Sequence, residues 1–265
     1  MYQAKAYSVV SSTAPFTSAT IQRRETTERD VQIEILFCGI CHSDLSLING
    51  TFPAQRPVVT QGHEASGTIA KLGPDVAAWS VGDRVVVAAG RPCGDCPNCR
   101  RGDGGHCLRL QLMAFAYDGA WAEYTVALAA GLTRVPDNVP LEQAAILADA
   151  VSTPFGAVVH TGKVGIGESV GVWGVGGVGT HIVQLARLVG AAPIIAIDIN
   201  PVVRDRALEL GADHALDSRD PDLKQKVADD WAGAKTESGE PASLEDIVLM
   251  CDDMIARLAK GEDPA

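Results

Sequence analysis

The stretch that decides the fold of the second half of the chain is SVGVWGVGGVG, residues 169–179. Its apolar start predicts a short strand over 169–173, and a run with helical periodicity follows over 178–189. A second, β-branched strand over 193–197 ends at Asp198. This order is the dinucleotide-binding fingerprint: a strand, G-x-G-x-x-G, a helix, a second strand and an acidic residue. We therefore expect a nucleotide-binding unit here.

The residues of the glycine-rich turn have separate tasks. Gly174 permits the tight turn, Gly176 lets the backbone approach a pyrophosphate, and Gly179 allows the helix to pack closely on the strand. The helix start at Gly177 and Val178 offers free N–H groups and the positive end of the helix dipole to the phosphates.

Asp198 stands 19 residues after Gly179, where it can accept hydrogen bonds from the adenosine ribose hydroxyls. A carboxylate at this place repels a 2′-phosphate, so NAD is favoured over NADP. Downstream, the pattern predicts a helix over 201–210, a third short strand over 213–216 and a helix over 221–230.

After residue 230 the alternation stops. A polar connector over 233–241 precedes one amphipathic helix over 243–260, with Ser243 as its N-cap and Cys251 within its apolar stripe. Three strands alone leave an exposed edge and an uncovered apolar face. We therefore predict that the helix over 243–260 docks on this incomplete sheet.

Upstream, four cysteines lie in a polar loop with the spacing C-x2-C-x2-C-x7-C. Thiolates at this spacing can close tetrahedrally around a structural zinc, which is favoured over an iron–sulfur cluster. His106 adjoins the last cysteine and is interpreted as an exposed loop residue. The four predicted ligands are Cys93, Cys96, Cys99 and Cys107.

A second candidate metal site combines FCGICHSD, residues 37–44, with the segment Gly62-His63-Glu64. A lone histidine is usually a half-buried imidazole with satisfied hydrogen bonds. Here the upstream Cys-His pair favours a catalytic zinc held by Cys41 and His63, because such a site takes three protein ligands and keeps one open position. Cys38 is interpreted as a small core residue.

The first half otherwise alternates apolar and polar residues, which predicts strands over 5–10 and 31–37. Glycines between residues 62 and 82 suit tight turns in a barrel-like β arrangement. An Ala-rich helix is expected over 141–150. Asp149 at its end would ordinarily be a cap or a surface charge.

Composition narrows the class of protein. The chain has 265 residues, a hydrophobic fraction of 46% and a net charge of −11. Such acidity argues against nucleic acid as a partner. Residues 1–15 do not resemble a signal peptide and no apolar run reaches spanning length, so we expect a cytoplasmic protein without membrane contact. Seven cysteines then favour metal sites over disulfides.

These motifs together resemble the zinc-containing medium-chain alcohol dehydrogenases of the medium-chain dehydrogenase/reductase superfamily. The resemblance covers about residues 5–227 and rests on CGICHSD at 38–44, the Gly-His-Glu segment, the four-cysteine lobe and the nucleotide fingerprint. It implies an α/β protein with a GroES-like β-barrel-type catalytic domain over 1–150. An incomplete Rossmann domain over 151–232 follows, and then a segment over 233–265 that does not match the family.

The resemblance also implies roles for single residues. Asp149 stands where members place a third ligand of the catalytic zinc, beside Cys41 and His63. Glu64 resembles the glutamate that can approach this metal, and Ser43 resembles the hydroxyl that begins the proton relay. His42 and Thr153 resemble residues that line the cofactor, and Ser46 replaces a relay histidine that many members carry.

The implied activity is hydride transfer between a small alcohol, or its aldehyde or ketone, and NAD, with two zinc ions per chain. The alternative is a catalytically silent, shortened homologue that binds zinc and part of a nucleotide. A zinc-free quinone reductase is disfavoured by the four-cysteine lobe and by Cys41 with His63. A homo-oligomer is doubtful, because the region that family members use for dimer contacts is not recognisable.

Overall fold

The computed structural model describes residues 1–231 apart from residues 10, 12 and 54–59. The described chain divides into two compact units, the first ending at Asp149 and the second beginning at Ala150. The predicted connector over 233–241, the helix over 243–260 and Cys251 lie outside the described residues.

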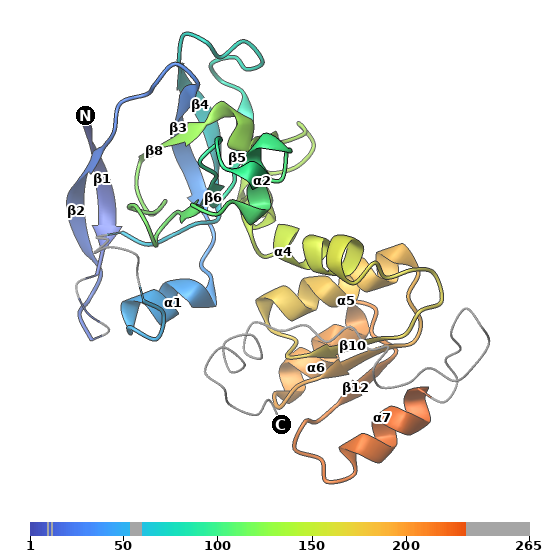
Figure 1. The fold of residues 1–265 in the computed structure, drawn as a ribbon. Helices are drawn as coiled ribbons and strands as arrows, with labels where there is room; N and C mark the ends of the chain where they lie inside the picture. The colour runs from blue at the N-terminus through green and yellow to red at the C-terminus, as the bar shows by residue number, and fades with distance from the viewer. Residues whose placement is uncertain (10, 12, 54–59, 232–265) are drawn as a thin grey trace. The chain divides into compact units, whose positions relative to one another are not determined.

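The first unit contains a five-stranded antiparallel sheet in the order β8-β3-β4-β5-β9 (Figure 1). Its core side chains are fully buried and include Val31, Ile33 and Ile69. Burying each such side chain contributes about 1.5–3 kcal/mol. The strands are β3 (Asp30–Cys38), β4 (Ala65–Leu72), β5 (Arg84–Val87), β8 (Tyr124–Leu128) and β9 (Leu132–Arg134).

Short elements surround this sheet. The ribbon of β1 (Tyr2–Ser8) and β2 (Thr17–Arg23) pairs separately, and the short helix α1 (His42–Ile48) follows β3 almost directly (Figure 1). The remaining elements of the unit are β6 (Gly90–Arg91), α2 (Pro97–Arg100), η1 (Gly104–His106), β7 (Gln111–Leu112), η2 (Ala129–Gly131), α3 (Leu141–Ala144) and η3 (Ala145–Ala148).

The second unit is a parallel sheet in the order β10-β11-β12 with helices on both faces (Figure 1). Side chains of β11 alternate between two apolar clusters, because successive residues of a strand point to opposite faces. Its elements are α4 (Ser152–Phe155), η4 (Gly156–Thr161), β10 (Val170–Trp173), α5 (Gly177–Val189), β11 (Ile194–Ile197), α6 (Pro201–Glu209), β12 (His214–Leu216) and α7 (Leu223–Trp231).

The expectation of an uncovered apolar face on this sheet was wrong. Ile194 and Ala196 belong to the large cluster shared with α5 and α6. Ile195 and Ile197 point to the other face and pack against Val227 of α7. The helix predicted over 221–230 therefore packs on this face, while the predicted docking of the helix over 243–260 falls outside the described residues.

Two element boundaries also differ from the sequence analysis. The first strand spans Tyr2–Ser8 rather than residues 5–10. The helix expected over 141–150 is one α-helical turn, Leu141–Ala144, followed by the 3-10 turn Ala145–Ala148. Tightening of the last turn is common at helix ends. Asp149 then leaves the helical conformation, with φ −141° and ψ −68°.

Among the described residues, no single helix has both the length and the apolar composition needed to cross a membrane. The consecutive helical segments Leu141–Ala148 and Ser152–Thr161 reach that length and composition only when they are counted together.

Candidate metal and cofactor sites

The pairing of β3 with β4 brings Cys41 and His63 together. Cys38 is the last paired residue of β3 and lies opposite Ala65, the first residue of β4. The backbone N–H of Gly39 also donates to the carbonyl oxygen of Glu64 at 2.9 Å. Cys41 comes shortly after this pair and His63 shortly before it, so the two loops meet at one end of the sheet.

A buried carboxylate, Asp44, fixes both loops. One of its oxygens accepts a hydrogen bond from the backbone N–H of Cys41 at 3.0 Å, and the other accepts one from the backbone N–H of Gly62 at 2.9 Å. The second oxygen also lies 3.3 Å from Nδ1 of His63. A carboxylate behind a ligating histidine orients the ring and sets which nitrogen faces the metal. This role of Asp44 was not predicted from the sequence.

The third candidate ligand, Asp149, meets the first two. Its Oδ2 lies 3.2 Å from Nε2 of His63 and 3.9 Å from Sγ of Cys41. One ligand atom from each of the three residues lies within 4.8 Å of the others. A thiolate, an imidazole and a carboxylate form a donor set suited to zinc, so these residues fit the metal that the sequence analysis expects.

Electrostatics at His63 agree with a cation site. Burial lowers the pKa of this imidazole, but the neighbouring Asp149 and Asp44 carboxylates outweigh it and raise the pKa to about 12. The surrounding carboxylates therefore stabilise a positive charge at the ring. Without a bound metal, this charge belongs to the protonated imidazole. Zinc binding must displace that proton, because the ligand is neutral imidazole.

Ser43 and Glu64 lie beside this cluster. The hydroxyl oxygen of Ser43 is 3.6 Å from Sγ of Cys41. Glu64 is buried, and its carboxylate lies against Gly39, where an added Cβ would come within 2.1 Å of Oε2. A larger residue at position 39 would therefore force the Glu64 side chain to shift.

Cys38 behaves as the expected core residue. It is half-buried and packs against the apolar core of the five-stranded sheet. Burial raises the pKa of its thiol to about 12. A thiol that stays protonated is a poor metal ligand.

The four cysteines of the lobe come together around α2 and η1. Their sulfur atoms all lie within 4.8 Å of one another, and no disulfide joins the cysteines of the described residues. Hydrogen bonds from backbone N–H groups lower the pKa of Cys96 and of Cys107, which favours thiolates at these two positions, whereas burial raises the pKa of Cys99 to about 12 while no metal is bound. These residues also fit zinc, in a closed four-sulfur arrangement. His106 is exposed and pairs with Asp103 at 2.6 Å.

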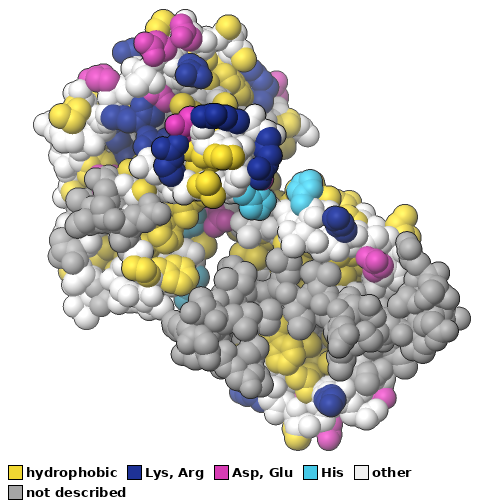
Figure 2. Space-filling view, in the orientation of Figure 1, with side chains coloured by type: hydrophobic (Ala, Val, Ile, Leu, Met, Phe, Trp, Pro, Cys, Tyr) yellow, Lys and Arg dark blue, Asp and Glu magenta, His cyan; other side chains and the backbone are white. Residues whose placement is uncertain are grey.

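Basic residues lie around this lobe. Figure 2 shows Lys and Arg side chains gathered over the part of the first unit that contains α2. Arg109 illustrates their position: its Nη2 lies 3.5 Å from Sγ of Cys93, and the same group pairs with Asp95. These positive charges oppose the negative charge of clustered thiolates.

In the second unit the fingerprint residues form the expected strand–turn–helix. Gly174 has φ +83°, which requires glycine. A Cβ on Gly179 would come within 2.0 Å of the carbonyl oxygen of Gly174. By contrast, a Cβ on Gly176 or Gly177 would meet nothing within 4 Å. The start of α5 is thus open to a ligand, which fits an approaching pyrophosphate.

Asp198 follows β11 directly, and its carboxylate is held by the backbone. Oδ2 accepts a hydrogen bond from the N–H of Val175 and Oδ1 one from the N–H of Asn200, each at 2.8 Å. Both oxygens retain lone pairs for ribose hydroxyls. His42, at the start of α1, and Thr153, in α4, are exposed within their own units.

Comparison with known proteins bears on both units. The model of the alcohol dehydrogenase GroES-like domain matches residues 27–137, and the model of the zinc-binding dehydrogenase domain matches residues 177–239. The chain belongs to the zinc-type medium-chain alcohol dehydrogenase family. The family and the α/β fold class expected from the sequence are thereby confirmed.

Several members of this zinc-type dehydrogenase family resemble the chain over most of its length. Geraniol dehydrogenase of Castellaniella defragrans is 33% identical over 83% of this chain, and alcohol dehydrogenase of Geobacillus stearothermophilus is 32% identical over 83%. The solved structure of a protein described as a zinc-binding dehydrogenase from Sinorhizobium meliloti, bound to NADP, covers 86% of this chain with a TM-score of 0.76 and 27% identity. The chain spans 64%, 65% and 66% of the lengths of these three relatives.

Proposed function

We propose that this family member is an NAD-dependent zinc alcohol dehydrogenase that interconverts a small primary or secondary alcohol with its aldehyde or ketone. The carrying observation is the convergence of Cys41, His63 and Asp149 within 4.8 Å, in a chain that also has the dinucleotide fingerprint. Relatives named as alcohol and geraniol dehydrogenases support this substrate class.

The first unit would hold the catalytic zinc through Cys41, His63 and Asp149. When bound, zinc supplies a Lewis acid that lowers the pKa of an alcohol hydroxyl and polarises a carbonyl oxygen. The Asp44 carboxylate, 3.3 Å from Nδ1 of His63, favours a proton on that nitrogen and so leaves the lone pair of Nε2 for the metal. The second zinc, at the four cysteines, would stabilise the lobe.

Ser43 is the proposed first member of the proton relay. Its hydroxyl lies 3.6 Å from the Cys41 sulfur, so it stands beside the metal ligands. During alcohol oxidation it accepts the hydroxyl proton while its own proton passes on towards water. When bound, NAD would supply the acceptor for a hydride from the alcohol carbon, so that the carbonyl product, NADH and one proton would result. Glu64, buried next to His63, is proposed to approach the metal when the site rearranges.

The second unit would bind the cofactor. The open start of α5 at Gly176, Gly177 and Val178 receives the pyrophosphate, and Asp198 accepts from the adenosine ribose. His42 and Thr153 are proposed to line the cofactor. A carboxylate at Asp198 supports NAD as the preferred cofactor, although one related structure holds NADP.

A matched pair of cysteine variants tests this function. The zinc-loaded chain is assayed with NAD and a panel of alcohols by following NADH absorbance. We expect Cys41→Ala to abolish turnover and Cys38→Ala, three residues away, to retain it. Zinc-loaded wild type that binds NADH but turns over none of these alcohols would contradict the proposal and favour the catalytically silent homologue.

A further inference from the structure

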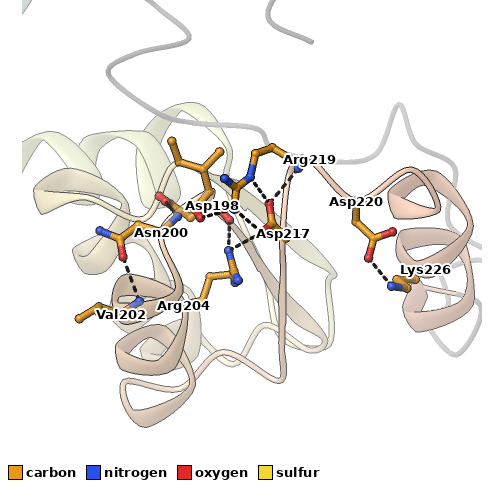
Figure 3. A network of polar contacts seen from close by, with 9 residues as sticks. Asp198, Asn200, Val202, Arg204, Asp217, Arg219, Asp220 and Lys226 are labelled. Atoms are coloured by element: carbon orange, nitrogen blue, oxygen red, sulfur yellow. Dashed lines mark hydrogen bonds and ion pairs between the residues drawn. The ribbon is translucent and has the colours of Figure 1, made fainter.

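A network of charged side chains lies at the carboxyl ends of β11 and β12 (Figure 3). Asp198 follows β11 and Asp217 follows β12, and the two strands pair in parallel. The backbone N–H of Asp198 donates to the carbonyl oxygen of Leu216 at 3.1 Å. The residues that follow these two strands, Asp198 and Asp217, therefore lie on neighbouring strands at the same edge of the sheet.

Asp217 binds two arginines at once. Its Oδ1 accepts from the backbone N–H of Arg219 at 2.9 Å and from Nε of the same residue at 3.0 Å. Its Oδ2 accepts from Nη2 of Arg219 at 2.8 Å and lies 3.2 Å from Nη1 of Arg204. The hydrogen bonds from Arg219 hold the pKa of Asp217 below its usual range, so the carboxylate is ionised.

These arginines are also the cations bound next to Asp198. Nη1 of Arg204 donates to the carbonyl oxygen of Asp198 at 2.7 Å, and Nη2 of Arg219 donates to that of Ile199 at 3.1 Å. Two guanidinium groups and two carboxylates, Asp198 and Asp217, sum to a charge of zero. A 2′-phosphate, which carries about −1.5 to −2 charges, would find no net attraction and no unoccupied guanidinium in this network.

We propose that Asp217 is a specificity-determining residue for the cofactor, because it holds Arg204 and Arg219 away from a 2′-phosphate and so favours NAD over NADP. The inference rests on the proposed function, since it requires a dinucleotide with its adenosine ribose at Asp198. Of the two arginines, Arg219 is the one that Asp217 chiefly restrains. Its side chain is 68% exposed, against 18% for Arg204, so Arg219 can turn towards a phosphate once it is released.

The test compares the affinities of the full chain for ADP-ribose and 2′-phospho-ADP-ribose by calorimetry. Asp217→Asn leaves the network with one net positive charge and frees Arg219. We expect the affinity ratio to shift about tenfold or more towards the phosphorylated ligand, the size expected of one charge-assisted hydrogen bond. Because the affinities for both ligands are measured with the same variant, a general loss of binding cancels in their ratio.

Two further variants serve as controls for this test. Asp220→Asn removes a carboxylate that pairs with Lys226 of α7 and is expected to leave the ratio unchanged within about twofold. Adding Arg219→Gln to Asp217→Asn is expected to cancel the shift, because Arg219 provides the new contact. If wild type binds ADP-ribose and the ratio for a folded Asp217→Asn is unchanged, the inference is overturned while the proposed function stands. If wild type binds neither ligand, both are overturned.

Discussion

The two cysteine-containing clusters of the first unit are built in opposite ways. The four sulfurs of the lobe come from one stretch of chain between Cys93 and Cys107, in which Cys96 and Cys107 are buried and Cys99 is half-buried. The other cluster joins residues far apart in the sequence: His63 is 86 positions and Cys41 is 108 positions from Asp149. The lobe can therefore form from local chain geometry, whereas the second cluster requires the folded sheet.

The groups behind the ligands differ in the same way. Asp44 is fully buried and binds the segments of Cys41 and His63 together. Arg109, which contacts Cys93, has a side chain that is 61% exposed. Buried charged partners are costly to lose, while exposed ion pairs contribute little. We therefore expect the Cys41 cluster to be the more sensitive to changes behind its ligands.

The largest effect is expected from His63→Ala. The change removes one ligand and leaves the Asp44 carboxylate buried beside a cavity. Zinc content should fall from about two to about one per chain, and alcohol turnover by at least about a thousandfold, because the Lewis acid is lost. Metal analysis and initial rates measure both. Turnover within about tenfold of wild type would contradict the assignment of this cluster.

Asp44→Asn tests the buried support alone, since all three ligands remain. We expect the affinity of the Cys41 cluster for zinc to fall about 10–100-fold, as for other residues that orient metal ligands. The lobe zinc should be unaffected. Competition with a chromophoric chelator resolves the two sites, and equal weakening of both would show that the change acts on the whole unit instead.

The pH dependence of stability in the same unit depends on Asp30. Burial raises the pKa of this carboxyl, but hydrogen bonds from Arg24 and Thr27 outweigh it and lower the pKa to about 2. A depressed pKa stabilises the fold above the unfolded value of about 4, and the gain is lost as the pH falls through about 2.

This shift corresponds to about 2 kcal/mol of unfolding free energy. Denaturant unfolding between about pH 5 and pH 2 measures it, and Arg24→Gln should lack most of the decline. An equal decline in Arg24→Gln would assign the acid sensitivity to other groups, such as the ligands of the two clusters.

The smallest effect is expected from Arg109→Gln at the lobe. Because the Arg109–Asp95 pair is exposed, the change should cost less than about 1 kcal/mol of lobe stability. Thermal unfolding and the zinc content of a Cys41→Ala background, in which only the lobe zinc remains, measure the loss. A weakening as large as that of Asp44→Asn would remove the contrast between the clusters.

The same contrast explains what the sequence could predict. The lobe and the dinucleotide fingerprint are local patterns, so spacing alone placed Cys93, Gly174 and Asp198 on the expected loop, turn and strand end. The role of Asp44 was missed, because it depends on the β3–β4 pairing that returns His63 to the start of α1. A signal was present: an acidic residue in the first turn of a helix, three positions after a candidate ligand, is a usual partner of that ligand's backbone N–H.

The packing of α7 on the second sheet was also not predicted from the sequence. The cover that α7 gives to Ile195 and Ile197 follows from the alternation of β11, but periodicity alone did not show which helix would take that face. The end of the helix before Asp149 was misplaced because Ala145–Ala148 tightens into a 3-10 turn, which is frequent at helix ends and is not marked by the sequence.

Anomalous scattering at the zinc edge, from crystals of the zinc-loaded chain, tests the central claim most directly. We predict two peaks per chain, one at the four cysteines and one at about 2.0–2.3 Å from Sγ of Cys41, Nε2 of His63 and an oxygen of Asp149. A single peak at the lobe, with the cluster around His63 empty at saturating zinc, would contradict the account.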